Sequence, residues 1–191
     1  MKADRRGFTV WLTGLSGAGK STIARMLADH LVELGIEIEV IDGDLLRQGL
    51  SSDLGFSRRD RDENVRRAAW LCTLLNRHGI VAIVALVSPY AAARELARDW
   101  IGQMVLVHVD CPLDVLRARD PKGLYLKSSQ GQMGGLTGID DPYEVPSAPD
   151  LRVDTSSESV DRSVERVLVV LQQRGYIVLN DDLPSRPPWR P

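Results

Sequence analysis

The sequence predicts an α/β fold, in which a parallel five-stranded sheet carries helices on both faces. Short apolar segments typical of strands alternate along the chain with segments whose apolar residues recur at helical spacing. A glycine-rich stretch, residues 14–21, joins the first strand to the first helix. Regular alternation of this kind places parallel strands side by side and packs the intervening helices against the sheet.

The expected strands are short and rich in apolar or β-branched residues. They cover residues 8–12, 37–42, 80–87, 104–110 and 151–155. The third is a continuous apolar run between Gly79 and Pro89, as expected of a strand that is buried on both faces. Helical spacing predicts helices over residues 22–34, 60–78, 92–101, 112–120 and 158–175.

Length and composition favour a single globular domain. The chain has 191 residues, of which 43% are hydrophobic and 26% are charged. We expect the domain to span residues 1–179, with a long irregular segment at about 121–149 that is rich in glycine, serine and lysine. So long a loop in a compact domain is usually functional, often a lid. The proline-rich end, residues 180–191, is expected to be extended or disordered.

Charge and cysteine content limit the classes of partner and compartment. The net charge of −2 provides no field that recruits nucleic acid or an acidic membrane, so neither is expected as a partner. Cys72 and Cys111 lie in apolar surroundings and are expected to be buried free thiols in a reducing compartment. No apolar run is long enough to span a bilayer, and the first residues lack the apolar core of a signal peptide. We therefore expect a cytoplasmic protein.

The stretch GLSGAGKS matches the phosphate-loop pattern G-x-x-x-x-G-K-[ST], and it lies between an expected strand and an expected helix. This match predicts a P-loop NTPase-type sheet that binds ATP and Mg²⁺. Lys20 is expected to reach the β- and γ-phosphates, and Ser21 to ligate the Mg²⁺. The expected nucleotide-binding residues are Gly14, Leu15, Ser16, Gly17, Ala18, Gly19, Lys20, Ser21 and Thr22.

The phosphate loop by itself does not name the reaction. A regulatory GTPase needs an N-K-x-D motif, which the sequence lacks. A match to D-x-x-G at residues 120–123 follows an expected helix rather than a strand end, so we attribute it to chance. The length suits a small kinase of the nucleotide-kinase type, which predicts basic residues in a lid. Lys122 and Lys127 lie in the segment where such a lid is expected.

Two carboxylates lie at the carboxyl end of the second expected strand, where ligands of an open α/β sheet bind. Asp42 and Asp44 are two residues apart, so both can approach the metal and the acceptor. Phosphoryl transfer to a hydroxyl needs a carboxylate that takes the hydroxyl proton. A helix N-cap is an equal alternative for Asp42. For Asp44, the acceptor role is favoured because Arg47 follows one turn later and would bind an anion.

Two further segments carry candidate acceptor contacts. Arg61 and Asn64 are one helical turn apart and can bind the same anion. Phe56 lies in a polar loop, where an aromatic side chain often stacks on a planar ring. Ser88 follows the central strand as a substrate contact, a turn residue or a phosphorylation site. Of these three, a covalent phosphoserine is the least favoured, because direct in-line transfer needs no intermediate.

Together these segments resemble the adenylylsulfate kinases (APS kinases). The matching segments follow the family's order over residues 7–177, and they are GLSGAGKS, DGDLLRQGL, DLGFSRRDRDENVRR, VSPYAA, RDPKGLY and GLTGIDDPYE. The resemblance implies transfer of the γ-phosphate of MgATP to the 3′-hydroxyl of adenosine 5′-phosphosulfate (APS), giving PAPS and ADP. It also implies a homodimer, and it makes ATP sulfurylase a candidate partner.

The resemblance also implies roles for individual residues. Lys20, Asp44 and Ser88 are the implied catalytic residues, with Asp44 as the base or metal-linked carboxylate and Ser88 at a position to which a phosphoserine is assigned in the family. Phe56 would stack on the adenine of APS, and Arg119 would lie near the base of ATP. The implied acceptor-binding residues are Asp42, Asp44, Arg47, Phe56, Arg61, Asn64, Val87, Ser88, Lys122, Gly135, Leu136 and Thr137.

Three positions depart from the pattern of many family members. Leu45 replaces a polar neighbour of the pocket, Gly134 replaces a lysine, and Leu136 replaces the second aromatic ring of an adenine sandwich. Replacing a ring by leucine loses about 1 kcal/mol of stacking energy. Weaker binding of APS is the favoured consequence, and a different acceptor is the alternative. A silent nucleotide-binding subunit is a third hypothesis, against which the intact Lys20 and Asp44 argue.

Overall fold

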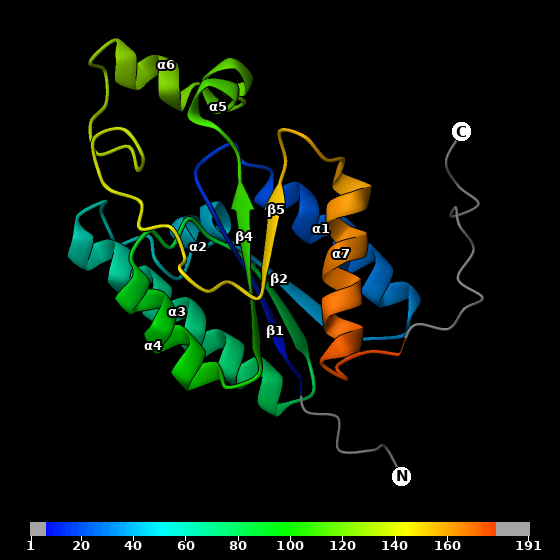
Figure 1. The fold of residues 1–191 in the computed structure, drawn as a ribbon. Helices are drawn as coiled ribbons and strands as arrows, with labels where there is room; N and C mark the ends of the chain where they lie inside the picture. Colours follow the sequence, from blue (N-terminus) through cyan, green and yellow to red (C-terminus); the bar gives the residue numbers. More distant parts are fainter. Residues whose placement is uncertain (1–6, 179–191) are drawn as a thin grey trace.

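The computed structural model describes residues 7–178 and confirms the predicted parallel sheet (Figure 1). Its strands are β1 (Thr9–Thr13), β2 (Ile38–Asp42), β3 (Val81–Ala85), β4 (Met104–Asp110) and β5 (Leu151–Asp154). They are ordered β2-β3-β1-β4-β5, and every neighbouring pair is parallel. β1 therefore lies at the centre, and β3, which we expected to be the central strand, lies beside it. The carboxyl ends of all the strands meet at one edge.

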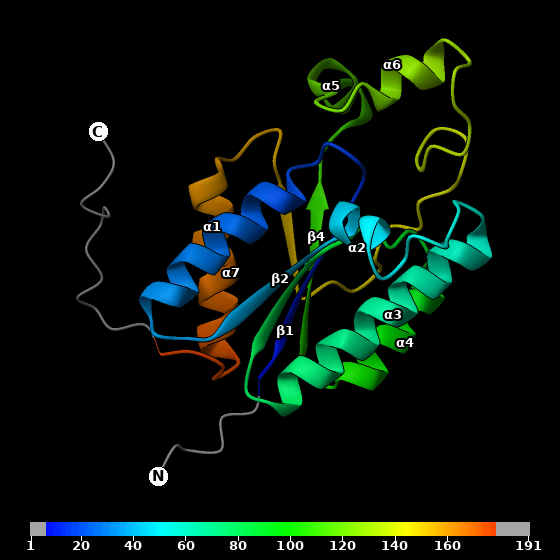
Figure 2. The same ribbon diagram turned by 180° about the vertical axis from the view of Figure 1, so that it is seen from behind.

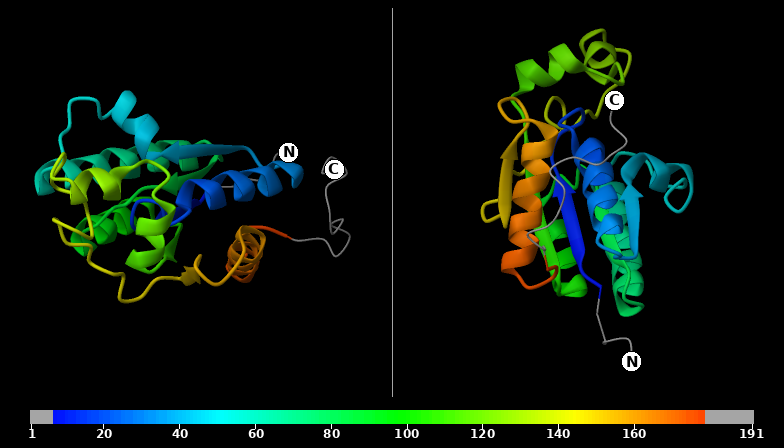
Figure 3. Two further views of the ribbon diagram at one scale, coloured as in Figure 1. Left: turned by 90° about the horizontal axis from the view of Figure 1, so that it is seen from above. Right: turned by 90° about the vertical axis from the view of Figure 1, so that its right-hand side faces the viewer.

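Helices cover both faces of the sheet, as predicted (Figures 1 and 2). They are α1 (Lys20–Glu33), α2 (Gly43–Gln48), α3 (Arg58–Arg77), α4 (Ala91–Ile101), α5 (Leu113–Arg119), α6 (Leu124–Ser129) and α7 (Val160–Gln173). α1 and α7 lie side by side on one face, and α3 and α4 lie on the other. α5 and α6 lie beyond the carboxyl edge of the sheet, as Figure 3 shows from the side.

Alternation along β1 explains why the core has two parts. Val10 and Leu12 join the cluster beneath α1 and α7, whereas Trp11 joins the cluster beneath α3 and α4. All three side chains are fully buried. Cys72 and Cys111 are buried free thiols, as predicted. Among residues 7–178, no helix is both long and apolar enough to cross a bilayer.

Two helices were not predicted from sequence, and both are short. α2 has 6 residues, which is too few for a helical pattern to be recognised, and the Asp42 side chain caps it by accepting from the amide of Asp44. α6, also of 6 residues, lies inside the segment 121–149 that we expected to be irregular throughout. The Asp120 carboxylate accepts from the amides of Tyr125 and Leu126 and so caps α6 from outside. The expected tail at 180–191 lies outside the described residues.

Candidate active site

A cleft of about 580 Å³ opens at the carboxyl edge of the sheet. The phosphate loop and the beginning of α1 form one side of it, with lining residues Ser16, Gly17, Gly19, Lys20, Ser21 and Thr22. The other side is lined by every residue predicted to bind the acceptor, namely Asp42, Asp44, Arg47, Phe56, Arg61, Asn64, Val87, Ser88, Lys122, Gly135, Leu136 and Thr137. The fold thus brings the predicted acceptor residues to most of the predicted phosphate loop, although Gly14, Leu15 and Ala18 do not line the cleft.

The phosphate loop has a backbone that only glycine adopts easily. Gly17 and Gly19 have φ values of 79° and 95°, in the left-handed region. At Gly14, an added Cβ would lie 2.2 Å from the carbonyl oxygen of Val109. Gly19 precedes α1 and provides no side-chain cap, so the first amides of the helix remain available to an anion. This geometry suits the phosphates of a nucleotide.

Lys20 is buried at the base of this loop, with 8% of its surface exposed. Its Nζ donates to the carbonyl oxygens of Gly14 and Leu15, at 2.9 and 2.8 Å. Burial, with a smaller contribution from the nearby Lys122 ammonium, lowers the pKa of Lys20 to about 8. The amine therefore lies among phosphate-binding backbone, where an anionic ligand would favour its charged form.

Ser21 and Asp42 form the pair that would hold Mg²⁺. The Ser21 hydroxyl donates to Asp42 Oδ2 at 2.6 Å, while Asp42 Oδ1 accepts from the Asp44 amide at 2.8 Å. Burial opposes ionisation of Asp42, but the bonds from Ser21 and the Asp44 amide outweigh it and lower its pKa. Asp42 therefore caps α2, as one of the two alternatives expected, while its role toward the metal or the acceptor stays a prediction. A hydroxyl beside an ionised carboxylate is an oxygen donor set that suits Mg²⁺.

Asp44, the predicted base, lies at the first turn of α2 and pairs with Lys122. Lys122 comes from the segment between α5 and α6, which we predicted to form the lid. Both side chains are largely exposed, at 62% for Asp44 and 48% for Lys122. The contact joins the acceptor side of the cleft to the predicted lid across 78 residues of sequence.

Arg47 and Phe56 stack on one another at the outer rim of the cleft. The Arg47 guanidinium carbon lies 4.4 Å from the centre of the Phe56 ring, and its Nη1 donates to Gly55 O at 2.9 Å. Phe56 remains 58% exposed. An exposed ring beside a fixed cation suits an aromatic and anionic ligand.

Arg61 is buried, with 8% of its surface exposed, and links three segments. Nε donates to Phe56 O at 2.9 Å, and Nη2 donates to Gly135 O at 2.5 Å and to an Asp141 carboxylate oxygen at 3.2 Å. Nη1 donates to no acceptor among the described residues. That nitrogen is the part of Arg61 available to an anion.

Asn64 and Thr137 carry polar atoms that lack protein partners. Asn64 Oδ1 and Thr137 Oγ1 are buried without a hydrogen bond within residues 7–178, and both residues line the cleft. Buried polar atoms almost always have partners, so unpartnered ones in a cleft are typical of ligand contacts. Thr137 follows Leu136, which is 7% exposed and packs against the main core.

Of the three residues that depart from the pattern of many family members, two lie where they can affect binding of the acceptor. Gly134 and Leu136 line the cleft, and the space around Gly134 is open, with nothing within 4 Å of an added Cβ. Leu45 does not line the cleft and is 63% exposed. Our expectation that Leu45 borders the pocket is therefore wrong, because the short helix α2 turns that side chain toward the outer surface.

Ser88 has a positive φ of 40° and is 3% exposed. Its Oγ accepts from the indole Nε1 of Trp11 at 3.1 Å, and its carbonyl oxygen accepts from Arg94 Nη1 at 2.6 Å. The carbonyl oxygen of the preceding Val87 accepts from the Thr13 hydroxyl at 2.7 Å. The corner after β3 is therefore held by side chains from β1 and α4.

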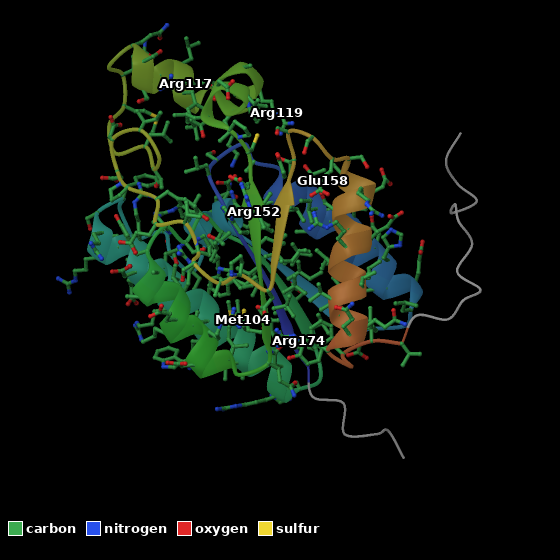
Figure 4. All side chains as sticks on the ribbon, in the orientation of Figure 1. Met104, Arg117, Arg119, Arg152, Glu158 and Arg174 are labelled. Atoms are coloured by element: carbon green, nitrogen blue, oxygen red, sulfur yellow. The ribbon has the colours of Figure 1, made fainter. Side chains whose placement is uncertain are left out.

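Arg119 lies outside the cleft lining, at the end of α5 (Figure 4). Its Nη2 donates to Thr155 O at 2.6 Å, and the Thr155 hydroxyl donates to Ala18 O at 3.0 Å. Arg119 thus supports the loop through Thr155. Its predicted place near the base of ATP stays a prediction.

Sequence reasoning missed several residues that build the site. Asp141 fixes Arg61, Arg94 fixes Ser88, and the Tyr125 hydroxyl of α6 donates to Ser16 O in the phosphate loop at 2.8 Å. These bonds join residues separated by 80, 6 and 109 positions. Only the bond from Arg94 to Ser88 is local in sequence, and no sequence motif indicates that Arg94 is buried.

The chain is similar in sequence to known proteins. The family model described as adenylylsulphate kinase matches residues 6–154. An adenylyl-sulfate kinase of Synechococcus sp. (strain JA-3-3Ab) is 49% identical over 173 residues, which cover 91% of this chain and 98% of that relative.

Solved structures agree with the sequence relatives. The structure of the Mycobacterium tuberculosis APS kinase in complex with AMPPNP and APS has a TM-score of 0.85 at 45% identity, over 87% of this chain and 98% of that chain. A hexameric APS kinase from Thiobacillus denitrificans has a TM-score of 0.70 at 36% identity, over 92% of this chain and 30% of that chain. By its family match and its identity to these relatives, the chain belongs to the adenylylsulphate kinase family.

Proposed function

We propose that the chain transfers the γ-phosphate of MgATP to the 3′-hydroxyl of APS, giving PAPS and ADP. The observation that carries the proposal is a single cleft in which a phosphate loop faces buried polar atoms without protein partners. The similar Mycobacterium tuberculosis enzyme was solved with AMPPNP and APS, which supports the same two ligands here.

The donor side would hold the triphosphate. The amides at the start of α1 and the Lys20 ammonium would neutralise the phosphate oxygens, while Ser21 and Asp42 would hold the Mg²⁺. The bound ion would offset charge on the β- and γ-phosphates. These groups position the γ-phosphorus and withdraw charge from the oxygen that leaves with ADP.

The acceptor side would supply the proton acceptor. As the 3′-oxygen bonds to the γ-phosphorus and the bond to the β,γ-bridging oxygen breaks, the hydroxyl proton passes to the Asp44 carboxylate. Lys122 contacts only Oδ2 of this carboxylate, so Oδ1 is the oxygen that would face the hydroxyl. Arg47 and Arg61 Nη1 would bind the phosphosulfate, and the exposed face of Phe56 would stack on the adenine.

We assign Ser88 to the wall of the acceptor site rather than to a covalent step. Its hydroxyl is buried and its oxygen accepts a hydrogen bond from the indole N–H of Trp11, so this oxygen is directed toward the sheet. After incubation with radiolabelled ATP and rapid denaturation, we expect no label on the protein. Stable labelling that disappears in Ser88→Ala and is chased into PAPS would contradict this assignment.

The first experiment is acceptor-dependent release of ADP from MgATP. We expect release with APS and only background release with AMP, adenosine or no acceptor. Equal release with AMP would show that the phosphosulfate is not recognised, and absence of release with APS would overturn the proposal.

A second candidate is a kinase on the same scaffold that acts on another hydroxyl acceptor. Gly134 and Leu136 favour it, because a cation and a ring found in many family members are missing from the cleft wall. A panel of nucleotides and small alcohols tests it, and a higher kcat/KM for any of them than for APS would support it.

Our proposal for the oligomeric state rests on the family resemblance and not on a contact between chains. We propose a homodimer and keep ATP sulfurylase as a candidate partner. Light scattering after size-exclusion chromatography measures the mass directly, for comparison with a 21.1 kDa chain. A mass of one chain would contradict the dimer.

A further inference from the structure

The corner after β3 is built on a strained residue. Ser88 has a φ of 40°, and among residues 7–178 only Asp120 is another non-glycine residue with positive φ. A left-handed conformation is unfavourable for a side chain with a Cβ and persists only where the surroundings hold it. Val87, Ser88 and Pro89 all line the acceptor side of the cleft.

Arg94 is the charged group that holds this corner. Its side chain is only 3% exposed, and Nη1 donates to Ser88 O at 2.6 Å. Trp11 and Thr13 hold the same corner from β1, through Ser88 Oγ at 3.1 Å and Val87 O at 2.7 Å. Arg94 therefore fixes the strained peptide from the α4 side.

The second nitrogen of Arg94 fixes the segment that returns from the predicted lid. Nη2 donates to Glu144 O at 2.5 Å. The Glu144 amide donates to Pro89 O at 2.8 Å, and its carboxylate accepts from the Ala91 amide at 2.7 Å. α4 has no side-chain cap of its own at Tyr90, so Glu144 caps it from across the chain. One guanidinium thus joins two segments 56 residues apart, at positions 88 and 144.

Packing alone does not explain an arginine at this place. Within the described residues, Arg94 makes no ion pair, although the Glu144 and Glu95 carboxylates are near enough to favour its charge, and its guanidinium carbon lies 5.8 Å from the centre of the Tyr143 ring. Burial nevertheless lowers the pKa of Arg94, so the buried charge is costly, and an apolar residue of similar volume would avoid that cost. What an apolar residue would lack is the pair of donors that meet Ser88 O and Glu144 O.

We infer that Arg94 is a positioning residue for the acceptor: by holding Ser88 O and Glu144 O together, it keeps the corner 87–89 and the returning segment in the arrangement that binds APS. The inference rests on the proposed function, because APS is the acceptor whose binding it predicts. Arg94 lies outside the cleft lining and need not touch the substrate.

The kinetic test compares Arg94→Met with the matched control Arg98→Met. Arg98 is on the same helix but pairs with Asp150 outside the cleft. Loss of a buried charged donor predicts a KM for APS that rises about tenfold or more in Arg94→Met. The KM for MgATP should stay near the wild-type value in both variants. A purely structural role would instead raise both Michaelis constants, so unchanged or equally raised constants in Arg94→Met would overturn the inference.

A second measurement does not depend on the reaction. In ¹⁵N-labelled protein, the Trp11 indole proton reports on Ser88, and Trp11→Phe assigns its signal. We expect this proton to exchange faster with solvent in Arg94→Met than in Arg98→Met. An unchanged exchange rate of the Trp11 indole proton would overturn the inference, whatever the reaction of the wild type. If the wild type did not phosphorylate APS, that result by itself would refute only the proposed function.

The conservative variant Arg94→Lys keeps the test valid if Arg94→Met does not fold. Arg94→Lys keeps the charge but not the fork of two donor nitrogens, so it should fold and reach one of the two carbonyl oxygens. We expect its KM for APS to lie between those of wild type and Arg94→Met. If Arg94→Met fails to fold, Arg94→Lys decides the question, and a wild-type KM together with wild-type Trp11 exchange in that variant would refute the role.

Discussion

The donor and acceptor sides of the cleft are built in different ways. Apart from Asp42, the donor side is one continuous segment, residues 14–22, whose shape depends on backbone dihedrals at Gly17 and Gly19. The acceptor side is assembled from side chains on α2, α3, the corner after β3 and the segment 121–149. Its contacts reach across the chain, as from Arg61 to Gly135 over 74 residues.

This difference predicts how each side responds to substitution. A local backbone loop has few parts, and losing its single buried cation removes the charge that transfer requires. A distributed wall shares binding among several groups, so that each substitution has a smaller and more selective effect.

The largest effect is expected for Lys20→Ala on the donor side. Removing the ammonium beside the developing phosphate charge should lower kcat by about 10³-fold, as losing a preorganised electrostatic donor does. Coupled ADP release with saturating APS measures it. Arg77→Ala, at an exposed position in the last turn of α3 and outside the cleft, is the control for loss of a cation and should keep wild-type activity. A kcat of Lys20→Ala within tenfold of the wild-type value would contradict the expected difference between the donor and acceptor sides.

Asp44→Asn tests the catalytic carboxylate of the acceptor side. Loss of the proton acceptor should lower kcat by about 10²-fold or more, with little change in the KM for MgATP. Asp29→Asn, at an exposed position of α1, controls for the loss of a carboxylate. Comparable kcat values for Asp44→Asn and wild type would refute the assigned role.

Arg61→Ala tests anion binding in the acceptor wall. Its loss should raise the KM for APS by about ten- to hundredfold, because a buried charged donor and its links to Phe56 O and Gly135 O disappear together. Arg66→Ala, which breaks an exposed pair with Glu63 on the same helix, is the control. An equal rise in the KM for MgATP would mean that the two sides are not separable.

The lowered pKa of Lys20 predicts a pH dependence confined to the donor side. Its pKa of about 8 means that the free amine loses its charge above that pH, whereas bound phosphates favour the ammonium. Binding of ATP should then take up a proton, and its affinity should fall by about tenfold per pH unit above pH 8 until the pKa of the complex is reached. Calorimetric titration at several pH values measures this. Lys20→Arg keeps its charge and should lack the dependence, so the same slope in that variant would assign it elsewhere.

The smallest effect is expected for Leu136→Phe. Restoring a ring should tighten APS binding by several-fold, since stacking is worth about 1 kcal/mol. Leu136 is 7% exposed and packs on the core, so the larger ring should also lower the melting temperature slightly. The exposed Leu126 provides the control variant Leu126→Phe. Weaker APS binding would show that overpacking outweighs stacking at this site.

Much of the fold could be predicted because its signals are local. The apolar runs gave β1 to β5 and the helical spacing gave α1, α3, α4, α5 and α7, each within a few residues of its observed ends. α2 and α6 escaped prediction because their 6 residues complete fewer than two turns. They are stabilised by the Asp42 and Asp120 caps rather than by an apolar stripe.

The phosphate loop of the donor side could be recognised from the amino-acid sequence, because a strand, a glycine-rich loop and the start of a helix are contiguous and need no distant partner to be recognised. Tertiary structure alone decided which groups meet on the acceptor side: Asp44 with Lys122, Arg61 with Asp141, and Arg94 with Ser88 and Glu144. Most of these contacts join segments that are far apart in sequence. The order of the strands and the path of residues 121–149 bring them together, and no local pattern encodes that path.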